Sequence, residues 1–243
     1  MVLVTHPMDM DGSRYRNFSY VWDKESMVAR WVAYPLNSRL MSGSGGRSDA
    51  WGLDPALPEK DQPVLYYGYR ESAVWARGHQ IPSADRKVRK YNEQTFYGVN
   101  MTPQSHDLNA GIWNELEQYV RTRCSAFDTL YVVTGCITEG SVEVAHDNVG
   151  KEVTVPTGYF KALLGFSKTG RTGGPAQGYT GVAFYFENRP YRGRDFMDDD
   201  NCMSIAELEE KAGLRLFVNL DSAIGAGTAS AVKSTVDDWW YSR

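Results

Sequence analysis

Two segments of this 243-residue sequence bring together side chains that could perform hydrolytic chemistry. One, residues 75–86, contains Arg77 and His79, and the other, residues 96–121, contains Asn109. Cleavage of a phosphodiester by water needs a base that titrates near neutral pH and a guanidinium that binds the non-bridging oxygens. A divalent cation that neutralises the phosphate and the leaving oxygen completes the requirement. His79, Arg77 and a Mg²⁺ site built on Asn109 would meet these needs.

The second segment also carries a four-residue spacing. The residues that recur at this interval are Asn109, Trp113, Glu117 and Arg121. With the apolar residues between them, they predict a helix over residues 109–121 and lie along one side of it. Because Mg²⁺ keeps several waters and takes few protein ligands, one amide oxygen could hold it. In such a site Asn109 would bind the ion and Glu117 would accept hydrogen bonds from metal-bound water.

Each of these residues also has a simpler structural interpretation. His79 could be a buried histidine satisfied by hydrogen bonds, and Asn109 could cap the N-terminus of the helix. Glu117 and Arg121 could form an exposed ion pair worth about 0.2–0.5 kcal/mol. Trp113 is expected in the core under every interpretation. The hydrolytic hypothesis therefore depends on the set of residues and not on any one of them.

The charge of the chain is acidic overall. Its 26 Lys and Arg residues and 30 Asp and Glu residues leave a net charge of −4, and the pI is near 5.6. Nucleic acid would therefore have to be bound by a local group of cations. One stretch offers such a group: Arg77, Arg86, Lys87, Arg89 and Lys90. Taken alone, this stretch is more typical of a solvated surface.

The number and spacing of the cysteines do not indicate a metal site or a disulfide framework. The three cysteines are Cys124, Cys136 and Cys202. No two form a C-x-x-C pair, so neither a zinc framework nor a disulfide scaffold is expected, and one disulfide with a free thiol or three buried thiols both stay open. A zinc site made of His79, His106 and Asp107 is disfavoured because their spacing matches no familiar zinc motif.

The hydrophobic pattern predicts the elements that must position the reactive residues. Segments typical of strands cover residues 19–23, 27–34, 129–134, 158–164 and 181–186, and the first two form a hairpin. A Gly/Ser-rich loop at 42–48 continues as loop to residue 62. Ser204 and Glu207 form a capping box that opens a helix, which ends at Gly213. Together these elements predict an α+β fold with a central antiparallel sheet.

The chain ends and the domain organisation follow from composition. Residues 1–16 are polar and irregular, which predicts a flexible N-terminal segment, and residues 17–243 are expected to form a single domain. No apolar run approaches the roughly 18 residues needed to span a bilayer. The first residues also lack the basic and apolar regions of a signal peptide.

Two motifs in fixed order resemble a known family. They are R-G-H-x-x-P-x-A-D from Arg77 and F-x-x-x-N-x-x-P-Q-x-x-x-L-N-x-G-x-W-x-x-L-E-x-x-x-R from Phe96. This order is similar to that of the DNA/RNA non-specific endonucleases, also called ββα-metal or His-Me finger nucleases, which include secreted bacterial sugar-non-specific nucleases and mitochondrial endonuclease G. The resemblance is dense from residue 75 to 121 and looser across most of the chain. It implies a central antiparallel sheet flanked by helices, with a ββα-metal active-site motif.

The resemblance also implies roles for individual residues. His79 matches the general base that activates water, and Asn109 matches the one direct protein ligand of Mg²⁺, for which Mn²⁺ could substitute. Glu117 matches the carboxylate that holds metal-bound water. Arg77 lies in the same motif as the base, and Arg47 is a looser match to the arginine that binds phosphate and stabilises the transition state.

Three further positions match residues that order or extend the site. Asn100 is a candidate to orient the histidine, Gln104 supports the site, and Arg121 is a further site arginine and a candidate partner of Glu117. One position departs from the family pattern. Ala76 stands where these nucleases usually have aspartate, and its presence is expected to lower activity or metal affinity without abolishing catalysis.

The resemblance therefore predicts a Mg²⁺-dependent endonuclease that contacts the phosphates of DNA and RNA with little sequence preference. The alternative is a catalytically impaired nuclease-like module that binds nucleic acid or a protein partner, which Ala76 alone supports. No membrane association is expected, whereas a homodimer is conceivable from the family. Since such an enzyme would be toxic in the cytoplasm, a secreted or periplasmic location is expected, with the signal peptide outside this sequence.

Overall fold

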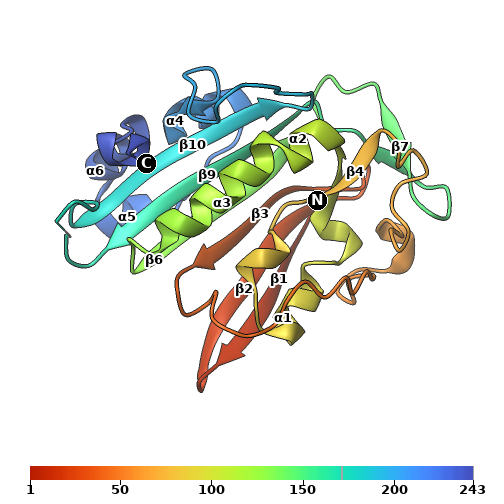
Figure 1. Cartoon of the computed structure of the whole chain (residues 1–243), viewed down its shortest axis with the longest axis horizontal. Coiled ribbons are helices and arrows are strands. Elements are labelled where there is room, and N and C mark those ends of the chain that lie inside the picture. Colours follow the sequence, from red (N-terminus) through yellow and green to blue (C-terminus); the bar gives the residue numbers. More distant parts are fainter. Residues whose placement is uncertain (171, 243) are drawn as a thin grey trace.

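The computed structural model describes residues 1–170 and 172–242. A seven-stranded sheet runs through the molecule in the order β1-β2-β3-β6-β9-β10-β11, and all neighbouring strands are antiparallel (Figure 1). The strands are β1 (Val2–Met10), β2 (Ser13–Asp23), β3 (Val28–Leu36), β6 (Thr129–Ile137), β9 (Gly158–Ser167), β10 (Gly178–Glu187) and β11 (Cys202–Met203). All five strand segments predicted from the sequence are present, and the structure extends several of them.

The predicted hairpin is formed by β2 and β3. Ser19 lies opposite Ala33, and the register shifts between Val21 and Trp22. Strand β9 lies between β6 and β10 and is buried along nearly its whole length, which matches its almost continuous apolar sequence. The α+β fold with a central antiparallel sheet is therefore confirmed.

The predicted flexible segment at residues 1–16 is wrong. Strand β1 pairs with β2 along its whole length, from Val2 opposite Trp22 to Met10 opposite Ser13, and it forms one edge of the sheet. His6 is buried and lies 2.7 Å from Asp54, a residue 48 positions away. The sequence gives no sign of this strand because alternate side chains face solvent and its stabilising partners are distant in the chain.

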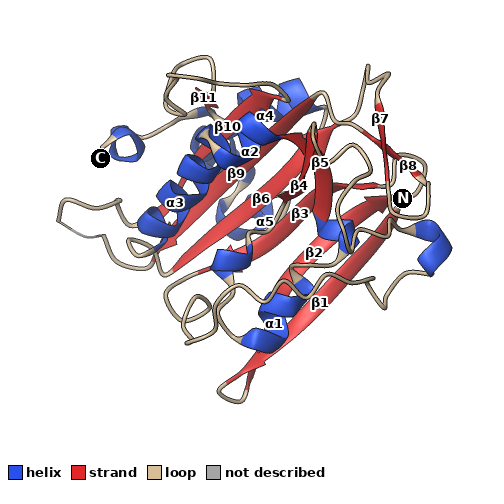
Figure 2. Cartoon of the chain, turned by 45° about the vertical axis from the view of Figure 1, so that its right-hand side comes forward, coloured by secondary structure: helices blue, strands red, loops and turns tan. Residues whose placement is uncertain are grey.

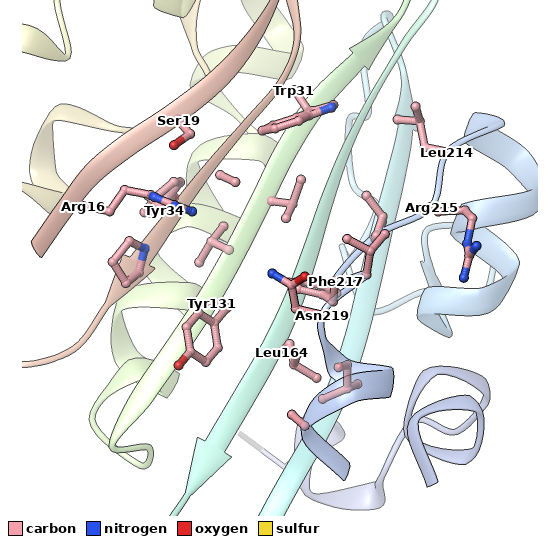
Figure 3. Close-up of a pocket in the computed structure, with 18 of the residues that line it drawn as sticks. Arg16, Ser19, Trp31, Tyr34, Tyr131, Leu164, Leu214, Arg215, Phe217 and Asn219 are labelled. Carbon is pink, nitrogen blue, oxygen red and sulfur yellow. The ribbon is translucent and has the colours of Figure 1, made fainter. Parts of the chain in front are cut away.

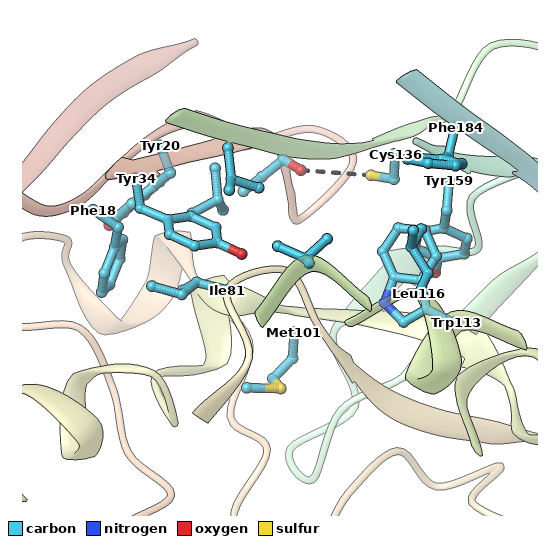
Figure 4. Packing of buried hydrophobic residues seen from close by; sticks show 14 of the residues in the cluster. Phe18, Tyr20, Tyr34, Ile81, Met101, Trp113, Leu116, Cys136, Tyr159 and Phe184 are labelled. Carbon is cyan, nitrogen blue, oxygen red and sulfur yellow. Dashed lines mark hydrogen bonds between the residues drawn. The ribbon is translucent and has the colours of Figure 1, made fainter. Parts of the chain in front are cut away.

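Helices cover both faces of the sheet (Figure 2). Helix α3 (Ile112–Cys124) packs on one face, and helices α4 (Ile205–Ala212), α5 (Leu220–Ile224) and α6 (Ala226–Ser234) pack on the other. In the core under α3, Trp113 and Leu116 lie against Tyr159 of β9 (Figure 4). Full burial of a large apolar side chain stabilises a fold by about 1.5–3 kcal/mol, so these contacts hold α3 firmly on the sheet.

A small second sheet sits on the same side as α3. It consists of β4 (Trp75–His79) and β5 (Met101–Ser105), which are antiparallel and are followed by α2 (His106–Ala110) and then α3. This succession is the expected ββα arrangement. The remaining short elements are α1 (Arg89–Gln94), β7 (Val144–His146), β8 (Glu152–Thr154) and the 3-10 turns η1 (Glu59–Asp61), η2 (Ser83–Asp85), η3 (Gly98–Asn100) and η4 (Asp238–Tyr241).

The predicted helix over residues 109–121 is interrupted. Gly111 separates α2 from α3 with φ −97° and ψ −119°, outside the helical region. A Cβ atom at this position would lie 2.5 Å from the carbonyl oxygen of Asp107, so only glycine fits the break. Asn109 therefore lies near the end of α2, whereas Glu117 and Arg121 lie on α3. The apolar spacing continues across the break, which is why periodicity alone does not reveal it.

Two other expectations are resolved by the structure. The capping box is present: the hydroxyl of Ser204 accepts from the N–H of Glu207, and the helix ends at Gly213 in the left-handed region. All three cysteines are buried and free, so of the two states left open the structure has three buried thiols.

None of the helices that the structure describes is long and apolar enough to cross a membrane.

Candidate active site

Aromatic rings and guanidinium groups surround His79, the last residue of β4. The guanidinium carbon of Arg77 lies 3.4 Å from the centre of the Trp51 ring, and that of Arg47 lies 4.9 Å from the Phe96 ring. The His79 ring makes edge contacts with both aromatic rings, at 5.7 Å from Trp51 and 5.2 Å from Phe96. Loop, strand and helix-flanking residues thus converge on one imidazole.

The imidazole of His79 is held neutral. Burial lowers its pKa, the positive charges of Arg47 and Arg77 lower it further, and a hydrogen bond with the backbone of Arg77 opposes them, leaving the pKa at about 3. The Nε2 atom is buried and has no hydrogen-bond partner among the described residues. A histidine satisfied by hydrogen bonds, the simpler interpretation, would not leave this nitrogen free. The ring can therefore accept a proton at Nε2.

The two arginines are anchored differently. Nη1 of Arg77 donates to the carbonyl oxygens of Leu65 and Tyr66, at 2.8 Å and 3.1 Å, so this side chain is fixed against a neighbouring loop. Nε of Arg47 donates to Asp49 at 2.8 Å, and half of the Arg47 side chain is exposed. Arg47 is therefore the more accessible of the two to a phosphate from solvent.

Gly78 lets the two strands of the small sheet approach closely. A Cβ atom on Gly78 would lie 2.5 Å from Oε1 of Gln104, so the side chain of Gln104 packs directly on the glycine. Neither amide atom of Gln104 has a hydrogen-bond partner in the described part of the chain, although both are buried. Ala76 is the cross-strand partner of Gln104 and offers it no polar atom.

Asn100 ties the chain beyond His79 to β5. Its Oδ1 accepts from the N–H of Ile81, and its Nδ2 donates to the carbonyl oxygens of Ile81 and Thr95. The contact therefore orders the backbone two residues after His79, and no hydrogen bond joins Asn100 to the imidazole within the described residues.

A second group of charged residues lies beneath α3. Glu117 is half-buried, and Lys161 of β9 is completely buried, with Nζ 4.7 Å from the centre of the Trp113 ring. Burial and the negative charge of Asp85 raise the pKa of Glu117 to about 7, although the positive charges of Lys161 and Arg121 lower it. Nζ of Lys161 has no hydrogen-bond partner among the residues that the structure describes. This ammonium group therefore acts on Glu117 through its charge.

Arg121 pairs with a different carboxylate from the one expected. Its Nη1 lies 3.2 Å from Oδ1 of Asp85, which is buried and also accepts from the hydroxyl of Tyr34 at 3.0 Å. Within the described residues no ion pair joins Glu117 to Arg121. The alternative of an exposed Glu117–Arg121 pair is therefore wrong, because both side chains turn toward a buried charged network.

The cationic stretch from Arg77 to Lys90 is exposed to solvent only in part. Arg86 is 1% exposed and donates to the side chain of Asn17 and to the carbonyl oxygen of Pro35, so it is a structural residue. Lys87, Arg89 and Lys90 are exposed, and Arg89 pairs with Glu93. The stretch is therefore divided between the core, the candidate site and the surface.

Asn109 caps neither helix. The N-cap positions of α2 and α3 are Ser105 and Gly111, and no side-chain hydrogen bond of Asn109 is present in the described part of the chain. The side chain is half-buried, so its amide oxygen stays available. This excludes the capping role that was the simpler interpretation.

A zinc centre of the kind considered above is not assembled. No group of three or more His, Cys, Asp and Glu residues within 1–170 and 172–242 could hold a metal ion. Nε2 of His106 lies 2.8 Å from the carbonyl oxygen of Ser72, and Asp107 pairs with Arg192. Both side chains are therefore engaged elsewhere, and the described residues give the zinc alternative no support.

Comparison with known proteins places the chain in a family. The sequence profile of the DNA/RNA non-specific endonucleases matches residues 3–223. The chain belongs to this family. The mitochondrial nuclease EXOG of Danio rerio is 32% identical over 215 residues, covering 84% of this chain and 60% of that protein. The nuclease of Serratia marcescens is 30% identical over 206 residues, covering 83% of this chain and 73% of the other.

The shared fold extends to a solved structure. In the crystal structure of the complex of EndoG with EndoGI, a chain matches with a TM-score of 0.65 at 19% identity, covering 88% of this chain and 86% of the other. The present chain spans about 60% of the length of the EXOG relatives. The ββα arrangement around His79 and Asn109 is therefore the arrangement of a nuclease-family fold.

The residues present fit a hydrated divalent ion. Buried polar atoms without partners among the described residues occur at His79 and Gln104, on the two strands of the ββα unit, and at Lys161 of β9. Unpaired buried polar atoms are costly in a finished core, but they are expected where water, an ion or substrate takes part. The free amide of Asn109 and the half-buried carboxylate of Glu117 supply the oxygen donors that Mg²⁺ prefers.

Sequence reasoning missed three side chains of this region. Trp51 stacks on Arg77, Asp85 holds Arg121, and Lys161 faces Glu117. A lysine within an otherwise apolar, buried strand was the one signal that could have been used, because a charged residue there requires a partner.

We expect Lys161→Met to lower nuclease activity while the protein still folds. Methionine keeps the buried side-chain volume and avoids the desolvation cost of the ammonium group, and Glu117, which loses a neighbouring positive charge, can take up a proton instead of staying as an uncompensated charge. Without the ammonium group the pKa of Glu117 rises further, so the carboxylate is protonated over more of the neutral range and the activity profile moves to higher pH. Thermal unfolding and pH–rate profiles of both proteins measure this. Lys211→Met, a surface change, is the control, and an unshifted profile would contradict the prediction.

A large cavity lies on the opposite face of the sheet and lacks this chemistry. It has a volume of about 800 Å³ and is bordered by β3, β6 and the segment before α5, with Trp31, Tyr131 and Phe217 around it (Figure 3). No His, Asp or Glu residue lines it. This cavity therefore offers no general acid or base of the His, Asp or Glu type.

Proposed function

We propose that this protein is a Mg²⁺-dependent endonuclease that hydrolyses phosphodiester bonds of DNA and RNA with little sequence preference. The observation that carries the proposal is His79, whose Nε2 is buried, unpaired and part of a neutral ring beside two guanidinium groups. Such a nitrogen is a proton acceptor, and a phosphate bound by Arg47 would offset one of the positive charges that lower the pKa of the ring, bringing it closer to the near-neutral range that a general base needs. Family membership supports the same chemistry.

His79 is the general base in this proposal. Its Nε2 takes a proton from the attacking water, and the hydrogen bond with the Arg77 backbone fixes the ring for that transfer. Arg47, which is half-exposed, binds the non-bridging oxygens and stabilises the transition state, while Arg77 supports the ring stack from its anchored position. Asn100 and Gln104 keep the two strands in place.

Asn109 and Glu117 hold the metal ion in this proposal, Asn109 directly and Glu117 through water. When bound, Mg²⁺, or Mn²⁺ in its place, neutralises the phosphate and the leaving oxygen. Arg121 is held by Asp85 and keeps a positive charge beside Glu117. Lys161 adds a second positive charge from below, so the carboxylate can accept hydrogen bonds.

The second candidate function is a nuclease-like module that binds nucleic acid or a protein without cutting. Ala76 favours it, because Gln104 lacks the polar neighbour that an aspartate would supply. Purified protein incubated with plasmid and with RNA, in Mg²⁺, Mn²⁺, Ca²⁺ or EDTA, separates the two. Cleavage that EDTA abolishes supports the endonuclease, whereas binding without cleavage in every metal supports the module.

Location and assembly are also proposals. We infer that the protein is secreted or periplasmic, because an unspecific nuclease would damage nucleic acid in the cytoplasm. A homodimer is proposed from the family alone. Neither depends on the chemistry at His79, and light scattering of the purified chain would test the second.

A further inference from the structure

A loop of uncovered tyrosines borders the candidate site. Residues 64–70 run past Arg77, which donates two hydrogen bonds from Nη1 to the carbonyl oxygens of Leu65 and Tyr66. Because Arg77 is two residues before His79 on β4, this loop lies directly beside the catalytic strand.

The rings of Tyr66 and Tyr67 lie open to solvent. Tyr66 is 44% exposed and Tyr67 is 88% exposed. In the part of the chain that the structure describes, neither ring contacts another ring or a cation, and neither hydroxyl has a hydrogen-bond partner. Large aromatic rings are usually buried, where they stabilise the fold. Exposed rings next to a candidate active site therefore indicate a surface that binds a ligand.

The backbone beneath these rings is firmly held. The N–H of Tyr67 donates to Oδ1 of Asn148 at 3.0 Å, and Nδ2 of Asn148 donates to the carbonyl oxygen of Gly68 at 2.7 Å. The N–H of Val64 donates to Asp147 at 2.8 Å, and that of Arg70 donates to the carbonyl oxygen of His146 at 2.8 Å. The rings are therefore presented by an ordered loop, which reduces the entropy lost when a ligand binds.

We propose that Tyr66 and Tyr67 form a stacking subsite for unpaired nucleobases of the strand that enters the site. The inference rests on the proposed function, since it places the strand at His79. Stacking on aromatic rings tolerates any base and therefore suits an enzyme with little sequence preference. The exposed guanidinium of Arg70 in the same loop supplies a local positive charge for the phosphate backbone, which the acidic net charge of the chain does not.

The chemistry of the loop favours nucleic acid over a protein partner. The two exposed rings of Tyr66 and Tyr67 are followed by one exposed cation, Arg70, and the nearby carboxylate of Glu71 is engaged by the ring and the backbone N–H of His146. A stable protein interface buries about 800 Å² on each partner, far more than two tyrosine rings and one guanidinium group can offer. The two rings should strengthen the binding of single strands more than that of duplexes, because the bases of a duplex are already stacked on their neighbours.

The test measures binding without cleavage. The double variant Tyr66→Ala/Tyr67→Ala, the single variant Tyr67→Ala and the wild type are titrated in EDTA against three labelled probes. These are a 12-nucleotide oligothymidylate, an abasic strand of the same length and a 12-base-pair duplex. We expect the double variant to bind the oligothymidylate about tenfold more weakly, in line with the loss per stacked base, and the abasic strand equally well. Tyr66→Phe/Tyr67→Phe should restore binding because it keeps the rings.

The control is Tyr131→Ala, which removes a ring of 40% exposure from the opposite face of the sheet (Figure 3). Equal binding of the oligothymidylate by the double variant and the wild type would overturn the subsite, as would an equal loss for the abasic strand. Plasmid cleavage by the wild type is measured separately. If the wild type cleaves plasmid but the tyrosine variants bind as it does, the subsite is wrong and the proposed function stands. If binding depends on the bases and no cleavage occurs, the subsite stands and the proposed catalysis is wrong.

Discussion

His79→Asn should reduce cleavage of plasmid DNA and of RNA by about 100- to 10,000-fold, the range that a general base contributes. Asparagine keeps a polar side chain of similar breadth but cannot accept a proton near neutral pH. Because the imidazole is neutral in the folded protein, the change removes no charge from the site. Initial rates in saturating Mg²⁺, with thermal unfolding of the same samples, measure the effect.

The control for this variant is His106→Asn. His106 is exposed, and its ring has one polar contact, with the carbonyl oxygen of Ser72. It should keep wild-type rates, and both variants should unfold within a few degrees of the wild type. If His79→Asn kept even a tenth of the wild-type rate, another group would have to be the base.

The residues proposed for catalysis were easier to single out from the sequence than the contacts around them. His79, Asn109 and Glu117 stand in a fixed order within a short motif, so local sequence alone makes them candidates. Trp51 lies 28 residues before His79 and contacts its ring, and Lys161 lies 44 residues after Glu117 and faces that carboxyl group, so only the folded chain brings each pair together. Spacing within one segment carries no information about such contacts.

The fold, too, could be predicted from the sequence only in part. Strands β6, β9 and β10 are buried on both faces, so their apolar runs identify them. Strand β1 is an edge strand that shows polar residues on one face, and its register is set by β2 and by the contact of His6 with Asp54. The break at Gly111 is equally invisible to periodicity, because the close approach to Asp107 is a property of backbone geometry.

This break bears directly on the proposed metal site. A continuous helix would have aligned Asn109 with Glu117 by spacing alone. In the structure, Asn109 lies near the end of a separate short helix, so its position relative to Glu117 depends on the turn at Gly111. The relative position of the two proposed oxygen donors therefore depends on the packing of α2 against β4 and β5 and not on helical spacing.

Asn109→Ala should remove metal-dependent cleavage, with a loss of more than the roughly 100-fold that outer ligands of a metal contribute. The alanine variant lacks the one amide oxygen proposed to bind the ion directly, while Glu117 remains to hold only water. The variant should fold normally, because Asn109 caps no helix and makes no side-chain hydrogen bond within the described residues. Rates measured over a wide range of Mg²⁺ concentrations distinguish lost affinity from lost turnover.

Asn114→Ala on the exposed side of α3 is the matched control, since it removes the same amide and should leave both the rate and the Mg²⁺ dependence unchanged. Asn109→Asp keeps an oxygen ligand and should recover part of the activity. If Asn109→Ala cleaved with the Mg²⁺ dependence of the wild type, the ion would have to be bound elsewhere. If it lost activity and unfolded at a much lower temperature, the Asn109→Asp variant would decide whether the missing function is the ligand or the fold.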